Sequence, residues 1–478
     1  MLTQLSGMDA MFLYQELDNA PMHIAGLAIY DPATAPGGFV RFKDILNTFE
    51  ERLHLSPIFR RRLVQVPLNL DHPYWIEDPN FDLEFHVRHI ALPKPGDWRQ
   101  LCIQTSRLFA RPMDLNRPLW EATVIEGLDN MEGVPEGSYA IFTKMHHAAI
   151  DGASGAEITA AIHDLTPEPR KLEPEETWVP DKEPTPAELL SRAYMNNLRT
   201  PFKMARVLSD AIPAISRVRA GVKSSELKSL GKKPKTRFNG PISAHRVFDG
   251  VNLSLEEVKA VKNAVEGATV NDVMLTTVGG ALRKYLEHRH ELPNGSLVAG
   301  APINVRTEEE KGTGGNMINQ MNVPLRTDIA DPKERLQAVH EEAVASKAYA
   351  NAVGARIMTD VTQSVPPAIA ALGSRAAVEA GLTHRFNPPF NCIVTNVPGP
   401  QIPLYMGGAK LVRNYGFAPL TEGMGLTHPI LSYDGMISIG FQACREMLPD
   451  PEFYAQCIQE SFDDLKRATG VQTPSKAA

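Results

Sequence analysis

The sequence predicts a layered α/β protein built from two domains. The chain has 478 residues, which corresponds to about three average domains or two large ones. Hydrophobic residues make up 43% of the chain and charged residues 22%, proportions that are ordinary for a folded protein and exclude disorder over most of its length. Short β-like runs alternate with helical segments in the first part of the chain, which is the pattern of a sheet covered by helices.

We expect the first domain to span residues 1–170. Its expected strand, two helices and second strand are, in chain order, His23–Ile29, Val40–Leu53, Trp98–Phe109 and Ala140–Lys144. The stretch Thr166–Thr185 is rich in Pro, Glu and Lys, a composition typical of a linker. The boundary of the domain is therefore placed within this stretch.

A basic amphipathic linker is expected over residues 171–240. Between Arg192 and Arg246 there are thirteen Lys or Arg residues and two acidic ones, a local net charge of +11 in a chain whose total is −7. Apolar residues at spacings of three and four predict one helical stripe in this region. The stripe consists of Leu190, Tyr194, Leu198, Phe202, Ala205, Leu208, Ile212, Ile215, Val218 and Val222.

The second domain is expected over residues 241–478. The predicted helices are Val270–Glu287, Pro332–Ala348 and Pro451–Ala468, and the predicted strands include Leu297–Val305 and Asn391–Thr395. Near the end, the runs HPILSY and MISIGF alternate in polarity on either side of Asp434-Gly435. This arrangement predicts a β-hairpin with a type I′ turn.

Composition and charge exclude several classes of function. A net charge of −7 argues against a nucleic-acid binder that acts through its overall field. The four cysteines have no CxxC or CxxH spacing, which fits neither a disulfide scaffold nor a zinc site. The first residues lack the basic and apolar regions of a signal peptide, and we expect a cytoplasmic protein.

The most informative motif is KMHHAAIDG at residues 144–152, which follows a β-like run directly. Adjacent residues of a strand point to opposite faces, so only one of His146 and His147 can face a given cavity. Three interpretations compete: structural histidines, a metal site and a general base. The metal site is disfavoured because neighbouring histidines diverge and no HExxH follows. An imidazole with an unperturbed pKa of about 6.5 is suited to accepting a proton at neutral pH.

Further motifs accompany HHxxxDG along the chain. They are SGMDAMFL at residues 6–13, PMH at 21–23, RPLWE at 117–121, VNDV at 270–273 and NVPGP at 396–400. Together they resemble the bacterial wax ester synthase/diacylglycerol acyltransferase family, within the superfamily of HHxxxDG CoA-dependent acyltransferases. The resemblance covers nearly the whole chain.

This resemblance implies an α/β (α+β) fold of two chloramphenicol-acetyltransferase-like domains, each a mixed sheet flanked by helices, with the active site at their interface. It implies transfer of a long-chain acyl group from acyl-CoA to diacylglycerol or a long-chain fatty alcohol, which forms triacylglycerol or wax ester. By motif match His147 is the general base, beside His146. Acyl-CoA is then a co-substrate, and no cofactor and no metal are expected.

The remaining site residues are also assigned by this resemblance. Asp151 is expected to hold the motif loop by pairing with Arg306 of the second domain. Asn271 is assigned a catalytic role and the neighbouring Asp272 a role in substrate binding, although capping of the predicted helix is an equal alternative for Asp272. The other expected substrate-binding residues are Pro118, Leu119, Trp120 and Gly152. A core position is the alternative for Trp120.

Several alternatives stay open. The basic linker either packs on the domains with a solvated cationic face or binds anionic lipid headgroups at a membrane or lipid inclusion, and attraction of the CoA phosphates is compatible with both. The acyl donor is alternatively a carrier protein, as in condensation domains. A non-catalytic lipid-surface protein is the third possibility. The isolated histidines, among them His428, are expected to be structural or exposed.

Overall fold

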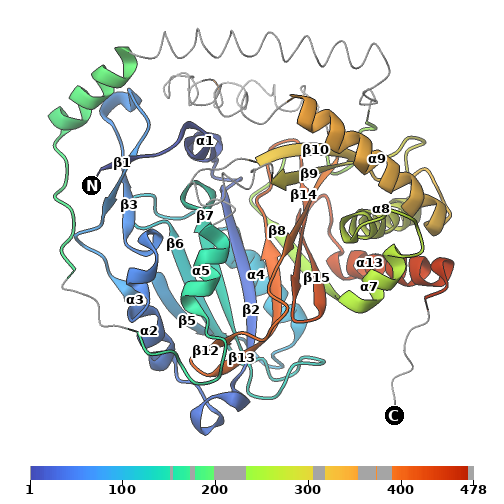
Figure 1. Ribbon diagram of the computed structural model, residues 1–478, viewed down its shortest axis with the longest axis horizontal. Helices are drawn as coiled ribbons and strands as arrows, with labels where there is room; N and C mark the ends of the chain where they lie inside the picture. Colours follow the sequence, from blue (N-terminus) through green and yellow to red (C-terminus); the bar gives the residue numbers. More distant parts are fainter. Residues whose placement is uncertain are drawn as a thin grey trace.

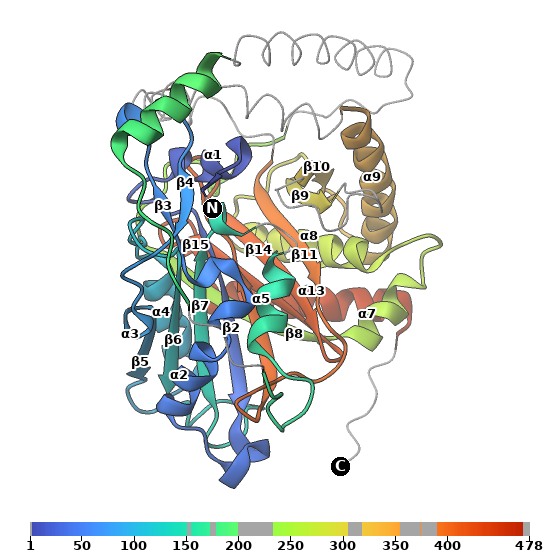
Figure 2. The ribbon, with the colours of Figure 1, turned by 60° about the vertical axis from the view of Figure 1, so that its left-hand side comes forward.

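The computed structural model describes residues 2–150, 154–172, 178–198, 233–304, 318–353, 373 and 390–471. These residues form two six-stranded sheets, which stand side by side, and one small three-stranded sheet. Figure 1 shows the first large sheet on the left and the second on the right, and in Figure 2 the second sheet with its helices is still to the right of the first. The expected α/β architecture with two sheet-containing domains is confirmed.

The first sheet has the strand order β12-β13-β2-β7-β6-β5. Neighbouring strands are antiparallel except for β5 and β6, which run parallel. Its strands are β2 (His23–Asp31), β5 (Val87–Ala91), β6 (Trp120–Glu126), β7 (Tyr139–His146), β12 (Tyr405–Met406) and β13 (Ala409–Phe417).

Helices cover both faces of this sheet because successive strand residues point to opposite faces and both sets are apolar. Tyr139 and Ile141 of β7 pack with α2 and α5, whereas Ala140 and Phe142 pack with α4 on the other face. The helices of this half are α1 (Gly7–Gln15), α2 (Phe42–Glu50), α3 (Leu83–His86), α4 (Trp98–Phe109), α5 (Ser154–Ile162) and a helix over residues 186–198.

The second sheet has the order β10-β9-β11-β14-β15-β8, with β11 parallel to both of its neighbours. Its helices α8, α9 and α13 share one large apolar core with the sheet. The elements are β8 (Arg246–Ser254), α7 (Leu255–Lys262), α8 (Val270–His288), β9 (Val298–Asn304), β10 (Ile318–Pro324), α9 (Pro332–Val353), β11 (Cys392–Pro398), β14 (Leu426–Tyr433), β15 (Met436–Cys444) and α13 (Pro451–Thr469).

The small sheet pairs β1 (Thr3–Gln4) and β3 (Arg61–Val64) with β4 (Tyr74–Glu77) between them. It lies beside α1 and the helix over residues 186–198 (Figure 1). Short 3₁₀ helices connect the elements of the first half: η1 (Pro32–Thr34), η2 (Pro36–Gly38), η3 (Leu53–Leu55), η4 (Pro57–Phe59), η5 (Pro67–Asn69) and η6 (His147–Ala149).

The chain does not divide between the two sheets at a single point. Strand β13, late in the sequence, pairs with β2 along nearly its whole length and completes the first sheet. The expected C-terminal domain, residues 241–478, therefore contributes strands to both sheets. This exchange ties the two halves together.

The two sheets also contact each other directly. Strand β13 packs against β14 and β15, and α4 packs against β8. A Cβ at Gly250 would lie 2.9 Å from the ring of Tyr415, so glycine permits this close approach. The indole of Trp98 donates a hydrogen bond to Asp249 Oδ1 at 2.7 Å, which adds a polar link to the apolar contact.

Most predicted elements agree with the structure. The helix Trp98–Phe109 has the predicted bounds because the Asp97 side chain caps its start. The hairpin turn at Asp434 and Gly435 has φ values of 42° and 80°, as a type I′ turn requires. The helix predicted over Val40–Leu53 is shorter, because α2 ends at Glu50 and the chain continues into η3.

Of the predicted basic amphipathic stripe, residues 190–198 are described and the rest lies outside the described residues. Within the described ranges, no helix is long and apolar enough to span a membrane.

Candidate active site

The two motif histidines lie where β7 ends and η6 begins. Strand β7 is central in its sheet, between β2 and β6. The backbone N–H of His146 donates to the carbonyl of Leu119 at 3.0 Å, and that of His147 donates to the carbonyl of Met22 at 2.9 Å. Both neighbouring chain segments thus hold the end of the strand.

His146 uses both of its ring nitrogens in hydrogen bonds. Nδ1 accepts from the backbone N–H of Ala148 at 3.0 Å, so the ring proton is on Nε2, which donates to Glu16 Oε2 at 3.2 Å. The side chain is completely buried. His146 therefore supports the turn after β7 and has no free nitrogen to accept a substrate proton.

His147 is in a different environment. Its ring stacks on Phe12 of α1 with a centroid distance of 3.9 Å and an interplanar angle of 10°. Nδ1 is buried and has no well-aligned hydrogen-bond partner among the described residues. Burial, with a smaller contribution from His146, lowers the pKa of His147 to about 4, and a hydrogen bond with its own backbone partly opposes this shift. The ring is therefore neutral near pH 7 and able to accept a proton.

An apolar cluster surrounds this turn. Its buried members are Leu5, Ala10, Leu63, Leu119 and Ala148, and its partly buried members include Phe12, Leu13, Trp75 and Ala149. An apolar lining lowers the local dielectric constant and disfavours the charged imidazolium. It is also the kind of surface that accommodates an alkyl chain.

The Pro118-Leu119-Trp120 segment leads into β6, whose first residue is Trp120, and is buried. Leu119 contacts the histidine turn through its side chain and its carbonyl. Trp120 lies in the main core of the first domain, where its indole donates to the carbonyl of Phe59 at 2.9 Å and its ring stacks on His86. Trp120 is thus a core residue, which was the alternative to a substrate-binding role. Substrate contact for this segment stays a prediction.

Asp272 caps α8, which was one of the two expected roles. Its Oδ2 accepts from the backbone N–H and the hydroxyl of Thr269, both at 2.9 Å. His340 of α9 lies 3.0 Å from the same oxygen. Asn271 is half-buried in the first turn of this helix, and its catalytic role stays a prediction.

Three predicted residues lie outside the described residues: Asp151, Gly152 and Arg306. The proposed pairing of Asp151 with Arg306 therefore stays a prediction. All four cysteines are buried. Among the described residues, no group of three or more His, Cys, Asp or Glu side chains could hold a metal ion.

Sequence reasoning missed Phe12 and Glu16. Phe12 belongs to a motif that carried the family resemblance but had no assigned function. Glu16 lies 130 positions from His146, and no local pattern links the two. His340 has the structural role expected of the isolated histidines, since it contacts the residue that caps α8.

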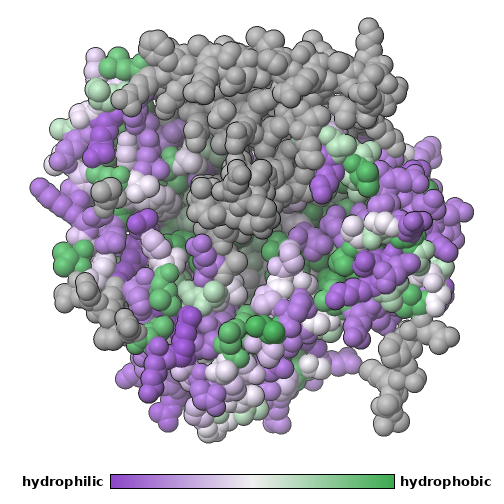
Figure 3. All heavy atoms as spheres, viewed as in Figure 1, coloured by the Kyte–Doolittle hydropathy of each residue, from purple (hydrophilic) through white to green (hydrophobic). Residues whose placement is uncertain are grey.

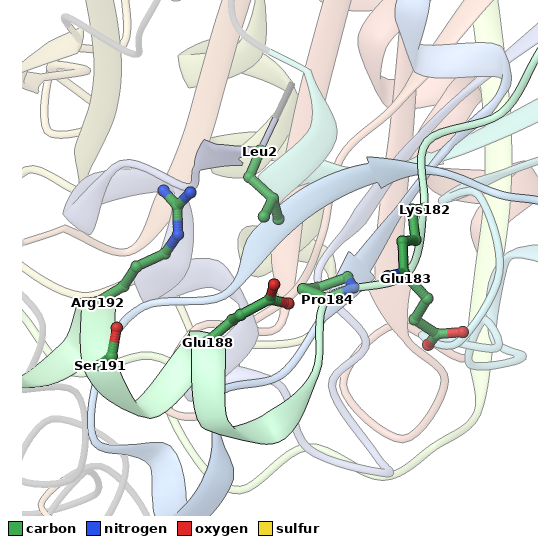
Figure 4. Close-up of a pocket in the computed structure, with 7 residues that line it drawn as sticks. All are labelled: Leu2, Lys182, Glu183, Pro184, Glu188, Ser191 and Arg192. Atoms are coloured by element: carbon green, nitrogen blue, oxygen red, sulfur yellow. The ribbon is translucent and has the colours of Figure 1, made fainter.

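A surface hollow of about 340 Å³ lies elsewhere, between the start of the chain and the helix over residues 186–198. Figure 4 shows the charged side chains of Glu188 and Arg192 at its edge. The other lining residues are Leu2, Lys182, Glu183, Pro184 and Ser191. The hollow is formed by the linker and contains no residue of the histidine turn.

Comparison with known proteins matches both halves of the chain. A model of the wax ester synthase/diacylglycerol acyltransferase catalytic domain matches residues 5–274, and one of the corresponding C-terminal domain matches residues 314–466. A putative diacylglycerol O-acyltransferase of Mycobacterium bovis is 31% identical over 471 residues, 97% of this chain and 98% of that protein. A putative diacylglycerol O-acyltransferase of Mycobacterium tuberculosis is 32% identical and covers 100% of both chains.

Solved structures give a consistent result. The wax ester synthase/diacylglycerol acyltransferase from Marinobacter aquaeolei VT8 matches with a TM-score of 0.67 and 25% identity over 98% of this chain and 100% of that one. The first condensation domain of the calcium-dependent antibiotic synthetase matches with a TM-score of 0.57 and 13% identity over 99% of this chain and 97% of that one. The second likeness concerns the fold alone.

Proposed function

The chain belongs to the wax ester synthase/diacylglycerol acyltransferase family, and on this basis we propose that it is an acyl-CoA-dependent O-acyltransferase. It transfers a long-chain fatty acyl group to diacylglycerol, a long-chain fatty alcohol, or both. The products are triacylglycerol or wax ester and free CoA.

The observation that carries the mechanism is the difference between the two histidines. Both ring nitrogens of His146 are engaged, whereas His147 is neutral, partly exposed and has no partner for Nδ1 among the described side chains. His147 is therefore the general base, and His146 and Glu16 position the turn that carries it.

The reaction is a direct displacement. The acceptor hydroxyl oxygen attacks the thioester carbonyl carbon, while His147 accepts the hydroxyl proton. The resulting tetrahedral intermediate collapses with cleavage of the C–S bond, and the protonated imidazole returns the proton to the departing thiolate. No acyl-enzyme is required, and acyl-CoA serves as a co-substrate without a bound cofactor.

Membrane contact is part of the proposal. Both acceptors and both products are apolar lipids, and residues between Arg192 and Arg246 carry a net charge of +11. Such a segment is attracted to anionic headgroups, with about 1 kcal/mol for each Lys or Arg near the surface. The enzyme then works at the inner face of the membrane or at lipid inclusions. A nucleic-acid partner is not proposed.

A thiol-release assay tests the activity. The purified chain, palmitoyl-CoA and hexadecanol are expected to release CoA, and His147→Ala is expected to abolish most of that release. Competition between hexadecanol and diacylglycerol for one acyl-CoA, with product analysis, then ranks the two acceptors. Release of the carrier protein's free thiol from an acyl-carrier-protein thioester, with no release of CoA from acyl-CoA, would favour the carrier-linked alternative.

A further inference from the structure

We propose that an exposed apolar surface of the N-terminal half, here called the apolar ridge, inserts into the headgroup layer of an anionic lipid surface. This inference rests on the proposed function and adds to it a site for the interfacial contact. The ridge comprises two segments of the chain. Its residues are Leu68, Leu70, Leu190, Tyr194, Met195 and Leu198.

The helix over residues 186–198 docks through one stripe and exposes another. Leu189 and Ala193 are 3% and 1% exposed and pack on Val66 and Tyr74. Tyr194 and Leu198 lie on the neighbouring stripe and are 66% and 52% exposed. The predicted apolar stripe therefore faces away from the protein body along this helix.

The second segment reaches the surface in an unfavourable backbone conformation. Leu68 is 84% exposed and has a φ of 57°, and Asn69 has a φ of 52°. The left-handed region is rare for a residue with a branched apolar side chain. Strain of this kind is concentrated at sites with a function, and here it holds an apolar side chain in solvent.

Two hydrogen bonds hold the segments side by side. Asn197 Nδ2 donates to the carbonyl of Leu70 at 2.9 Å, and Asn196 Nδ2 donates to Asp71 Oδ2 at 2.7 Å. Figure 3 shows a few hydrophobic residues among hydrophilic ones at the upper left of the molecule, over the helix that carries one of these segments. The ridge is thus a preformed surface on a rigid support.

The charge of the segment that follows in the sequence indicates what binds to the ridge. Residues 199–237 follow the ridge directly and contain eleven Lys or Arg residues against two acidic ones. A second copy of this chain would bring the same positive charge to the contact and be repelled. An anionic lipid surface is attracted to that charge and accepts apolar side chains. Stable attachment to membranes generally requires two such signals together.

Vesicle flotation at low and high salt separates the two contributions. The full-length chain is tested with phosphatidylcholine vesicles and with vesicles that also contain phosphatidylglycerol. Added salt screens the charges but not the apolar insertion. We expect wild type to retain partial vesicle binding in 1 M salt. In the double variant Leu68→Gly/Tyr194→Ser, this remaining binding should decrease by about tenfold or more.

Two controls keep the result interpretable. Glycine accepts the positive φ at residue 68, so the thermal midpoint of Leu68→Gly should not fall below that of wild type. Phe39→Ser removes a side chain that is 62% exposed from the loop before α2, at the other end of the domain from the helix over residues 186–198 (Figure 1). Its vesicle binding should match wild type.

The outcomes are distinct from those of the activity assay. Equal high-salt vesicle binding by wild type and the double variant would contradict the proposal that the ridge inserts into lipid. A dimeric wild type that becomes monomeric in the double variant would contradict it as well. CoA release with detergent-dispersed hexadecanol should be unchanged in the double variant. If wild type does not release CoA, the proposed function is wrong, whereas the vesicle result still tests whether the ridge binds lipid.

Discussion

The turn after β7 in the first sheet and strand β14 in the second each carry a histidine with a lowered pKa. Burial lowers the pKa of His147 to about 4 and that of His428 to about 3. The two residues differ in their partners. His428 Nε2 lies 2.8 Å from the Tyr454 hydroxyl, and its Nδ1 lies 3.4 Å from the carbonyl of Ile393. His147 instead presents a ring stacked on Phe12.

A shifted pKa alone does not identify a catalytic base. Desolvation acts on any buried imidazole, whatever its purpose. A base also needs a nitrogen that the protein leaves to the substrate, and His428 has none while both of its ring nitrogens are engaged. The expected structural role of His428 is confirmed by these contacts.

The largest effect is expected when the proposed base is removed. His147→Ala should lower kcat by roughly 10²–10⁴-fold, the usual contribution of a general base. The circular dichroism spectrum should stay that of the wild type. A comparable loss in His146→Ala, with normal activity in His147→Ala, would show that His146 is the base and that the proposed assignment is wrong.

Removal of His428 should affect stability rather than chemistry. His428→Ala leaves the buried Tyr454 hydroxyl without its partner in a core position, which costs about 1–3 kcal/mol. Denaturant unfolding measures this loss. The kcat of the folded variant at 20 °C should remain within a factor of a few of wild type, and a loss as large as that of His147→Ala would contradict the distinction.

Glu16→Gln sharpens the role of the first histidine. Glutamine keeps an oxygen that accepts from His146 Nε2 but removes the negative charge beside it, whereas Glu16→Leu removes the hydrogen bond as well. We expect a severalfold loss of kcat for the first and about a tenfold larger loss for the second, since a misplaced base reduces rate strongly. Equal activity of both variants would exclude positioning through this contact.

The pH profile tests the lowered pKa of His147. The acid limb of kcat/KM reports the free enzyme's base, so activity should persist below pH 6 and fall as pH approaches about 4.

The folding stability of the protein changes in the same pH window. His23, His147, His163 and His428 have lowered pKa values when folded because of burial, so the unfolded chain binds more protons and stability decreases as pH falls below about 6.5. Initial rates must therefore be measured at low temperature.

The smallest expected effect concerns Phe12. Phe12→Leu keeps an apolar side chain but removes the ring that covers His147. Water then reaches the imidazole more easily, which should raise its pKa toward the usual value and move the acid limb upward. Phe12→Tyr keeps the ring and serves as the control. An identical acid limb in Phe12→Leu and wild type would show that the stacked ring does not set this pKa.

Local sequence was sufficient for many elements and for the identity of the motif. The Asp97 cap defines the start of α4, and Asp434-Gly435 defines the hairpin turn, because both depend on residues within a few positions. The divergence of two neighbouring histidines follows from strand geometry alone. Contacts between distant parts of the chain could not be predicted in this way.

The amino-acid sequence by itself determined the α/β class and the family, and it predicted one base in the histidine pair. Only the tertiary structure decided which distant residues contact that pair. Glu16 reaches His146, Phe12 covers His147, and β13 returns to the first sheet. The physical reason is that caps, turns and strand alternation are local, whereas burial and hydrogen-bond partners depend on which distant segments the packed core brings together.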